Sequence, residues 1–186
     1  MTAAAPRVAP LPGDQWDDQV RSALGVLLPP DRINPQDAGN VLGTLVHNPA
    51  LTQAYLRFNK YVLVDSTLSA RVREIAVLRT VLLRKCPYLW SHHIPIAERA
   101  GLTTDEIAAI ETGEFGSGAD RAVLLAVDEL DTQAKVSDGT WATLGEHFDD
   151  AGRIDLIFAI GCYGLLATAV NTLGIEDEDR SRDTLT

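Results

Sequence analysis

Two stretches of this sequence are apolar nearly all the way around a helix, and they constrain the fold more than any other feature. The first covers about residues 69–84, where the Ile75–Leu83 stretch is interrupted only by Arg79 and Thr80. The second covers about residues 153–173. A helix that is apolar on every side must be buried, either at the centre of a domain or between subunits. We therefore expect both segments to pack in a helical bundle and the chain to form an oligomer.

Signals for helix starts and ends recur through the rest of the chain. Three predicted helices cover residues 15–28, 36–47 and 49–64, and pairs of proline or polar residues set their limits. Further helices begin at capping residues, which are Thr103 with Glu106 as a capping box and a stop at Gly113, then Ser117, then Ser137. No run of period-two alternation is long enough to indicate a strand. The sequence therefore predicts an all-α fold.

The length and composition suit a single domain. The chain has 186 residues, of which 46% are hydrophobic and 23% are charged, as in ordinary globular proteins. Residues 1–13 are rich in Ala and Pro and predict a flexible arm, whereas residues 176–186 predict an acidic, solvated tail. Residues 14–175 then form one helical-bundle domain.

Charge and cysteine content argue against several classes of protein. The net charge of −10 repels phosphate backbones, so we expect no nucleic-acid partner. Only Cys86 and Cys162 are present, which rules out a disulfide framework and is typical of a reducing cytosol. The longest uncharged apolar run, Ile157–Val170, is shorter than the ~20 residues that cross a bilayer, and the N-terminus lacks a signal-peptide pattern. We expect a cytoplasmic protein without a membrane partner.

The region around Pro87 holds the candidate catalytic residues. Proline favours the first helical position, so Cys86 is the expected N-cap, where the helix dipole favours thiolate and should lower the pKa of the thiol. His93 lies two helical turns further along on the same face, and His92 is rotated about 100° away, which excludes a zinc site built from the pair. If the preceding helix packs as an antiparallel hairpin, Glu74 could reach this face. Glu74, His93 and Cys86 would then form a proton relay.

Three further side chains are candidates for substrate binding, and each has a structural alternative. Tyr88 and Trp90 could line a pocket between helices, although their near-helical spacing is also typical of packing. Arg79 lies inside an apolar run, so it should pair with a buried carboxylate or, alternatively, hold the carboxylate of a substrate. Cys86 could equally be a small buried hydrophobe. We predict no metal and no cofactor.

A set of motifs between Ser66 and Gly113 carries a family resemblance. They are Arg73-Glu74, Cys86-Pro-Tyr-Leu-Trp-Ser-His-His93, Ala100-Gly-Leu-Thr103 and Glu106-Ile107. These motifs resemble the carboxymuconolactone decarboxylase family, which includes the alkylhydroperoxidase D-like proteins. Later elements at 126–130, 161–163 and 171–174 resemble its peroxidase-related branch. The resemblance covers the chain from about Leu51 onward, and it implies an alkylhydroperoxidase D-like bundle that forms trimers or multiples of them.

The resemblance also implies roles for individual residues. In the alkylhydroperoxidase branch the site is a Glu, then a CxxC motif, then a His four residues after the second Cys. Glu74 matches the Glu, Cys86 the first Cys and His93 the His, whereas Leu89 stands at the position of the second Cys. That second thiol attacks the peroxide in the family, so a two-cysteine cycle at this motif is excluded. Cys162 could supply a partner only if its Cα came within ~7 Å of that of Cys86.

Three functions remain open. The first is peroxiredoxin-type antioxidant chemistry, in which Cys86 reduces a hydroperoxide, becomes a sulfenic acid and is reduced by an external thiol. The second is a cofactor-free decarboxylase or isomerase of a lactone or keto acid that uses Glu74 and His93. The third is a non-catalytic oligomer whose pocket binds an apolar ligand. We expect the first, a thiol-dependent oxidoreductase with a small-molecule substrate.

Overall fold

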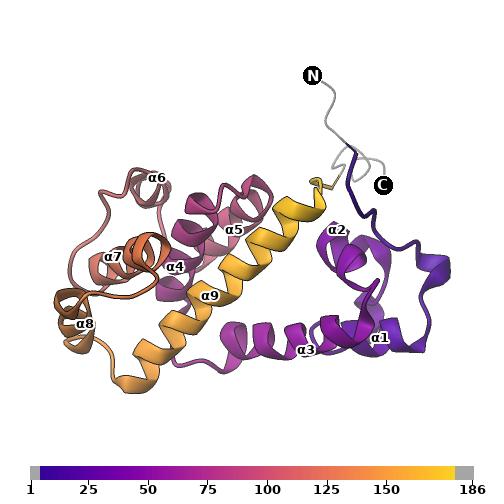
Figure 1. The fold of residues 1–186 in the computed structure, drawn as a ribbon, viewed down its shortest axis with the longest axis horizontal. Helices are drawn as coiled ribbons and strands as arrows, with labels where there is room; N and C mark the ends of the chain where they lie inside the picture. The colour runs from indigo at the N-terminus through magenta and orange to yellow at the C-terminus, as the bar shows by residue number, and fades with distance from the viewer. Residues whose placement is uncertain (1–4, 179–186) are drawn as a thin grey trace. The chain divides into compact units, whose positions relative to one another are not determined.

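The computed structural model describes residues 5–178, so residues 1–4 of the predicted arm and 179–186 of the predicted tail lie outside the described residues. Every regular element in the described range is a helix, which confirms the all-α prediction (Figure 1). The chain divides into two compact units, Met1–Leu63 with Ala169–Thr186, and Val64–Thr168.

Three α-helices build the first unit around Trp16. They are α1 (Asp18–Leu24), α2 (Pro35–Leu45) and α3 (Pro49–Lys60), accompanied by the 3-10 turns η1 (Gly13–Gln15) and η2 (Pro30–Arg32). A side-chain oxygen of the preceding Asp or Asn caps each α-helix by accepting a backbone N–H. The Trp16 side chain packs on Val20, Leu24, Ala38 and Val46. Its indole N–H donates to the Leu11 carbonyl at 3.0 Å, so this large side chain is buried with its polar atom satisfied.

The helices of this unit end differently from the sequence prediction. The helix expected over 15–28 is shorter, because Asp17 is extended and caps α1 at Asp18. The third helix continues beyond Lys60 as a π-helical turn, η3 (Tyr61–Asp65). Within the predicted arm, the described residues 5–13 make backbone hydrogen bonds: Arg7 N–H donates to the Leu173 carbonyl and Leu11 N–H to the Gly43 carbonyl, both at 2.8 Å.

The second unit is built around α4 (Ala70–Leu83). This helix packs against α5 (Pro87–Arg99), α6 (Thr104–Thr112) and α7 (Gly118–Gln133), while α8 (Asp138–Gly145) packs on α7. The α4 side chains Ile75, Ala76, Leu78 and Val81 are fully buried. Burying a large aliphatic side chain contributes about 1.5–3 kcal/mol each, so the expectation that this segment is buried is confirmed and explains its apolar circumference.

The predicted helix boundaries of α6 are confirmed. Thr103 and Glu106 form the reciprocal capping box, and Gly113 ends the helix with φ 80°. The positive φ favours glycine here, and a Cβ would also lie 2.9 Å from Nη2 of Arg79, so that side chain would have to move. Ser117 precedes α7 as predicted, but its side chain makes no capping hydrogen bond.

The last helix, α9 (Asp150–Leu173), is buried on one face only. Residues 150–168 belong to the second unit. Within them Leu156, Ala159 and Tyr163 are buried, whereas Ile154, Phe158 and Leu165 are exposed. Among the described residues it is the one helix whose length and mean hydropathy of 1.8 would allow it to cross a membrane, and core helices of soluble proteins meet the same criteria. Its Asp155 is buried and accepts hydrogen bonds from Thr67, as expected of a packed helix.

Arg71 ties three helices of the second unit together. From α4, its guanidinium donates to Glu106 of α6 at 2.5 Å and to Asp120 of α7 at 2.9 Å. It also donates to the Gly101 carbonyl at 3.0 Å. The hydrogen bond from Arg71, followed by one from the Thr103 backbone N–H, lowers the pKa of Glu106 from its ordinary 4.5 to about 2.

We predict that Glu106→Gln destabilises the protein in a pH-dependent way. Because the pKa of Glu106 is lower in the folded state than in the unfolded state, its contribution is present above about pH 4.5 and is lost as the pH falls towards 2. Since the carboxylate is partly exposed, we expect a loss of about 1–2 kcal/mol at pH 7, including the capping box, and less at pH 3. Urea unfolding at both pH values tests this. The exposed Glu98→Gln is the control, and an equal loss at pH 3 and pH 7 would contradict the prediction.

Candidate active site

Glu74 and His93 form a buried hydrogen-bonded pair between α4 and α5. Glu74 has 0% of its surface exposed and His93 has 7%. Oε2 of Glu74 lies 2.8 Å from Nδ1 of His93. A carboxylate can only accept, so in this pair Nδ1 carries a proton, and a neutral ring then has its lone pair at Nε2. Such a ring is oriented to take or return a proton at Nε2.

The second oxygen of Glu74 has no hydrogen-bond partner. Oε1 is buried, and the nearest cation is the Arg73 guanidinium, whose Nε lies 3.5 Å away and is also without a hydrogen bond. The ring of Tyr163, from α9, stands edge-on to His93 with centroids 4.9 Å apart. Buried polar atoms without partners are rare in folded proteins because they cost free energy, so this cluster is a candidate functional site.

Cys86 is the N-cap of α5, as the sequence predicts, but its thiol differs from the expectation. The residue is 1% exposed, and burial raises the pKa of its thiol, although a hydrogen bond from the Leu89 amide lowers it in part. The position at a helix N-terminus predicts the opposite shift. Desolvation outweighs the helix dipole here because the sulfur lies among apolar side chains rather than in solvent.

Of the three predicted catalytic residues, Glu74 and His93 are joined by a hydrogen bond. Among the described residues, the side chain of His93 hydrogen-bonds to Glu74 and contacts Tyr163, and no hydrogen bond joins it to Cys86. The buried Leu89 lies between the two positions on α5. Both cysteines, Cys86 and Cys162, are free and buried. The structure thus contains an assembled Glu–His pair and a separate thiol.

Cys86 lines a cavity of its own. This cavity has a volume of about 320 Å³, and its lining residues are Val81, Leu82, Lys85, Cys86, Pro87, Trp90 and Glu111. Trp90 therefore lies where a substrate of Cys86 would bind. Tyr88, the other predicted substrate-binding aromatic residue, instead stacks on His92 with centroids 4.3 Å apart.

Arg79 is occupied by the protein itself. It donates to both carboxylate oxygens of Asp128, at 2.6 and 3.1 Å, and to the carbonyl oxygens of Ile110 and Glu111. The sequence predicted that Arg79 pairs either with a carboxylate of the protein or with one of a substrate, and the first of these is present in this structure. The carboxylate is half-buried rather than fully buried.

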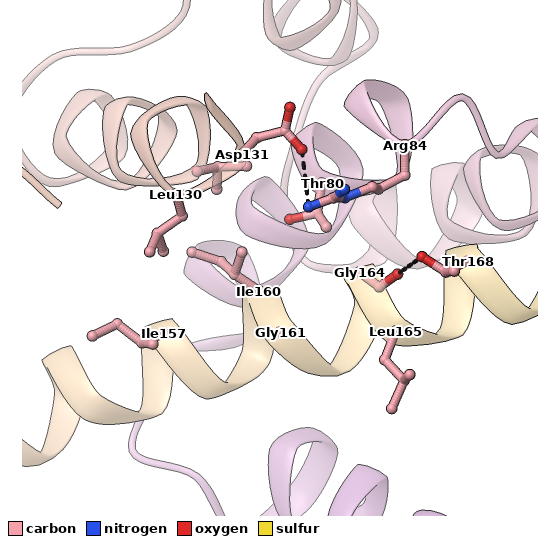
Figure 2. Close-up of a pocket in the computed structure, with 11 residues that line it drawn as sticks. Thr80, Arg84, Leu130, Asp131, Ile157, Ile160, Gly161, Gly164, Leu165 and Thr168 are labelled. Carbon is pink, nitrogen blue, oxygen red and sulfur yellow. Dashed lines mark hydrogen bonds and ion pairs between the residues drawn. The ribbon is translucent and has the colours of Figure 1, made fainter. Parts of the chain in front are cut away.

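A larger cavity lies elsewhere in the second unit, where α9 passes α4 and α7 (Figure 2). It has a volume of about 390 Å³ and an apolar floor that includes Val127, Ile157 and Ile160. Arg84 and Asp131 form an ion pair of 3.2 Å at its edge. None of the six predicted site residues lines it.

Sequence reasoning missed two residues of the Glu74–His93 cluster. Arg73 and Tyr163 stand in the motifs that carry the family resemblance, but nothing in the spacing assigned either one to the site. Arg73 is adjacent to Glu74, and adjacent helical residues diverge by about 100°, so its contact depends on how the long side chain folds back. Tyr163 lies 70 residues from His93, and only the packing of α9 brings their rings together.

The comparisons with known proteins agree with this fold and with part of the sequence resemblance. Residues 49–129 match the model of the Carboxymuconolactone decarboxylase family, which confirms the resemblance inferred from the motifs. No protein of curated function matches the sequence.

Solved structures with the same fold include two peroxidase-related proteins and a debrominase. An alkylhydroperoxidase AhpD core protein from Ralstonia eutropha is 22% identical, with a TM-score of 0.74 over 95% of each chain. A peroxidase-related protein from Silicibacter is 14% identical, with a TM-score of 0.78 over 96% of this chain and 95% of that one. The debrominase Bmp8 is 18% identical, with a TM-score of 0.73 over 96% of this chain and 95% of its own. At these identities the likeness establishes the fold alone.

We predict that Cys86 reacts slowly with alkylating reagents at neutral pH. Because burial raises the pKa of the thiol and covers it, iodoacetamide should modify it at least about tenfold more slowly at pH 7.5 than it modifies free cysteine. The rate should still rise above pH 9. Mass spectrometry in a Cys162→Ala background measures this, and the urea-unfolded protein is the control. Rapid modification below pH 7 would contradict the prediction.

Proposed function

We propose that this chain, whose residues 49–129 match the model of the carboxymuconolactone decarboxylase family, is a small-molecule enzyme with the Glu74–His93 pair as its proton-transfer centre. The observation that supports this most is the 2.8 Å hydrogen bond between two ionisable side chains that are almost fully buried. Burying such a pair costs several kcal/mol in desolvation, which an apolar pair at the same positions would avoid. The arrangement is therefore best explained by chemistry rather than by stability.

In the proposed reaction His93 is both base and acid. Its Nε2 lone pair takes a proton from the substrate, and the imidazolium that forms is stabilised by the Glu74 carboxylate through Nδ1–H. The same proton then returns to another atom of the substrate, so the enzyme ends unchanged. For a lactone or keto acid, this transfer supports isomerisation. It also supports decarboxylation, in which His93 takes a proton from water and delivers it to the carbon that loses CO₂.

Thiol chemistry at Cys86 is the second candidate, supported by the cavity that the thiol shares with Trp90. The thiolate would attack a hydroperoxide oxygen, breaking the O–O bond and leaving a sulfenic acid and an alcohol. One external thiol would then form a mixed disulfide and release water, and a second would restore Cys86 and leave as a disulfide. The fold shared with peroxidase-related proteins and with a debrominase supports including hydroperoxides and brominated pyrroles among the test substrates.

A homo-oligomer, a trimer or a multiple of it, is part of the proposal. Its support is the exposed apolar face of α9, where Ile154, Phe158 and Leu165 each expose more than half of their surface. Single exposed apolar residues are ordinary, but several on one helix face favour a protein contact. A cytoplasmic location stays a prediction from the sequence.

We predict that His93→Ala and Glu74→Gln each lower turnover by about 10²-fold or more, whereas Cys86→Ser changes it less than about threefold. Lactone acids, keto acids, tert-butyl hydroperoxide with dithiothreitol, and tribromopyrrole form the substrate panel. His92→Ala is the matched control, because its ring stacks on Tyr88 and lies outside the pair.

The same variants separate the two candidates. Loss of hydroperoxide reduction in Cys86→Ser, with turnover retained in His93→Ala, would reject the acid–base proposal and favour the thiol enzyme. Full activity in both variants would show that neither group carries the reaction. Circular dichroism of each variant checks that the helical fold is intact.

A further inference from the structure

Arg73 is a charged neighbour of Glu74 that does not hydrogen-bond to it. Its Nε lies 3.5 Å from Oε1 of Glu74, and both atoms are buried without a hydrogen-bond partner. The Arg73 side chain is only 14% exposed. Two other arginines of α4 behave differently, since Arg71 and Arg79 donate hydrogen bonds of 2.5–3.3 Å to the carboxylates that they pair with. Arg73 thus places a positive charge beside the cluster but does not hold the Glu74 carboxylate by hydrogen bonds, as Arg71 and Arg79 hold their partners.

The cluster is electrically balanced when His93 is neutral. Arg73 carries one positive charge and the Glu74 carboxylate one negative charge, so a protonated His93 would leave a net positive charge in a buried site. If Arg73 were absent, the carboxylate would have only His93 to neutralise it. The imidazole would then hold a second proton more tightly, because a buried carboxylate needs a cation nearby.

The other groups around His93 do not alter this balance. The described contacts of its ring are Glu74 from α4 and the edge of Tyr163 from α9, and a tyrosine is uncharged at neutral pH. His92, its neighbour on α5, stacks on Tyr88. Cys86, at the start of the same helix, is a buried thiol whose raised pKa keeps it neutral. Among the described contacts of its ring, the charge nearest His93 is therefore that of Glu74, with Arg73 behind it.

We propose that Arg73 is a positioning residue that balances the charge of Glu74 and so keeps His93 a neutral base with Nε2 unprotonated. The inference rests on the proposed proton-transfer role of His93, because a base is useful only if it is unprotonated before the reaction. Arg73 touches neither the substrate nor the transferred proton. It acts through Glu74.

An NMR titration of the full chain with ¹³C-labelled histidine tests this without any turnover. The His93 signal is assigned by its absence in His93→Gln. We expect His93 to be neutral at pH 7 in the wild type, and we expect Arg73→Gln to move its titration midpoint upward by about one pH unit or more. Arg73→Lys keeps the positive charge, so its midpoint should lie close to that of the wild type. Arg84→Gln is the control, because it removes a positive charge at the C-cap of α4, where Arg84 pairs with Asp131. It should leave the His93 midpoint nearly unchanged.

Three results would overturn the proposal. They are a His93 that is already protonated at pH 7 in the wild type, a midpoint that Arg73→Gln leaves unchanged, and a midpoint that Arg84→Gln moves equally. The first of these overturns it even if Arg73→Gln fails to fold. Where a substrate has been found, the acid limb of kcat/KM should move with the midpoint while the plateau at high pH is kept. If the midpoint moves but no substrate on the panel turns over, Arg73 has the role inferred here and the proposed function fails separately.

Discussion

The hydrogen bond between Glu74 and His93 is the interaction on which the candidate site depends. It joins α4 to α5 through a carboxylate with no exposed surface and an imidazole that is almost as deeply buried. Taking these groups out of water costs several kcal/mol, and one carboxylate oxygen is left without a hydrogen bond. A fold optimised only for stability would place apolar side chains at both positions. The pair is therefore a feature that packing alone does not explain, and the proposed function is built on it.

The central helix α4 can hold such a pair because the rest of its surface is used for packing and for ion pairs. Its apolar residues lie in the core of the unit, and two of its arginines pair with carboxylates of neighbouring helices. Arg71 reaches α6 and α7, and Arg79 reaches Asp128 of α7. These charge-assisted hydrogen bonds fix the neighbouring helices around α4. Arg73 is the exception, since its charge lies next to the Glu–His pair without a hydrogen bond from Nε.

The candidate site could be predicted in part because helical spacing is local. The boundaries of α6, the N-cap position of Cys86 and the burial of α4 all follow from residues within a few positions of one another. The pairing of Glu74 with His93 needed one assumption beyond this, that α4 and α5 pack side by side, and they do. The ionisation of Cys86 could not be obtained in this way. A helix N-terminus favours thiolate, but the desolvation that outweighs it comes from surrounding side chains.

The sequence by itself determined the helices, their caps and the residue types available for chemistry, because backbone hydrogen bonding and side-chain periodicity depend on near neighbours in the chain. The tertiary structure alone decided which of these residues act together. It placed Cys86 at a cavity with Trp90, joined Glu74 to His93, and brought Tyr163 against His93. Burial, charge balance and hydrogen-bond partners depend on what other helices place around a group. They exist only once the helices have packed.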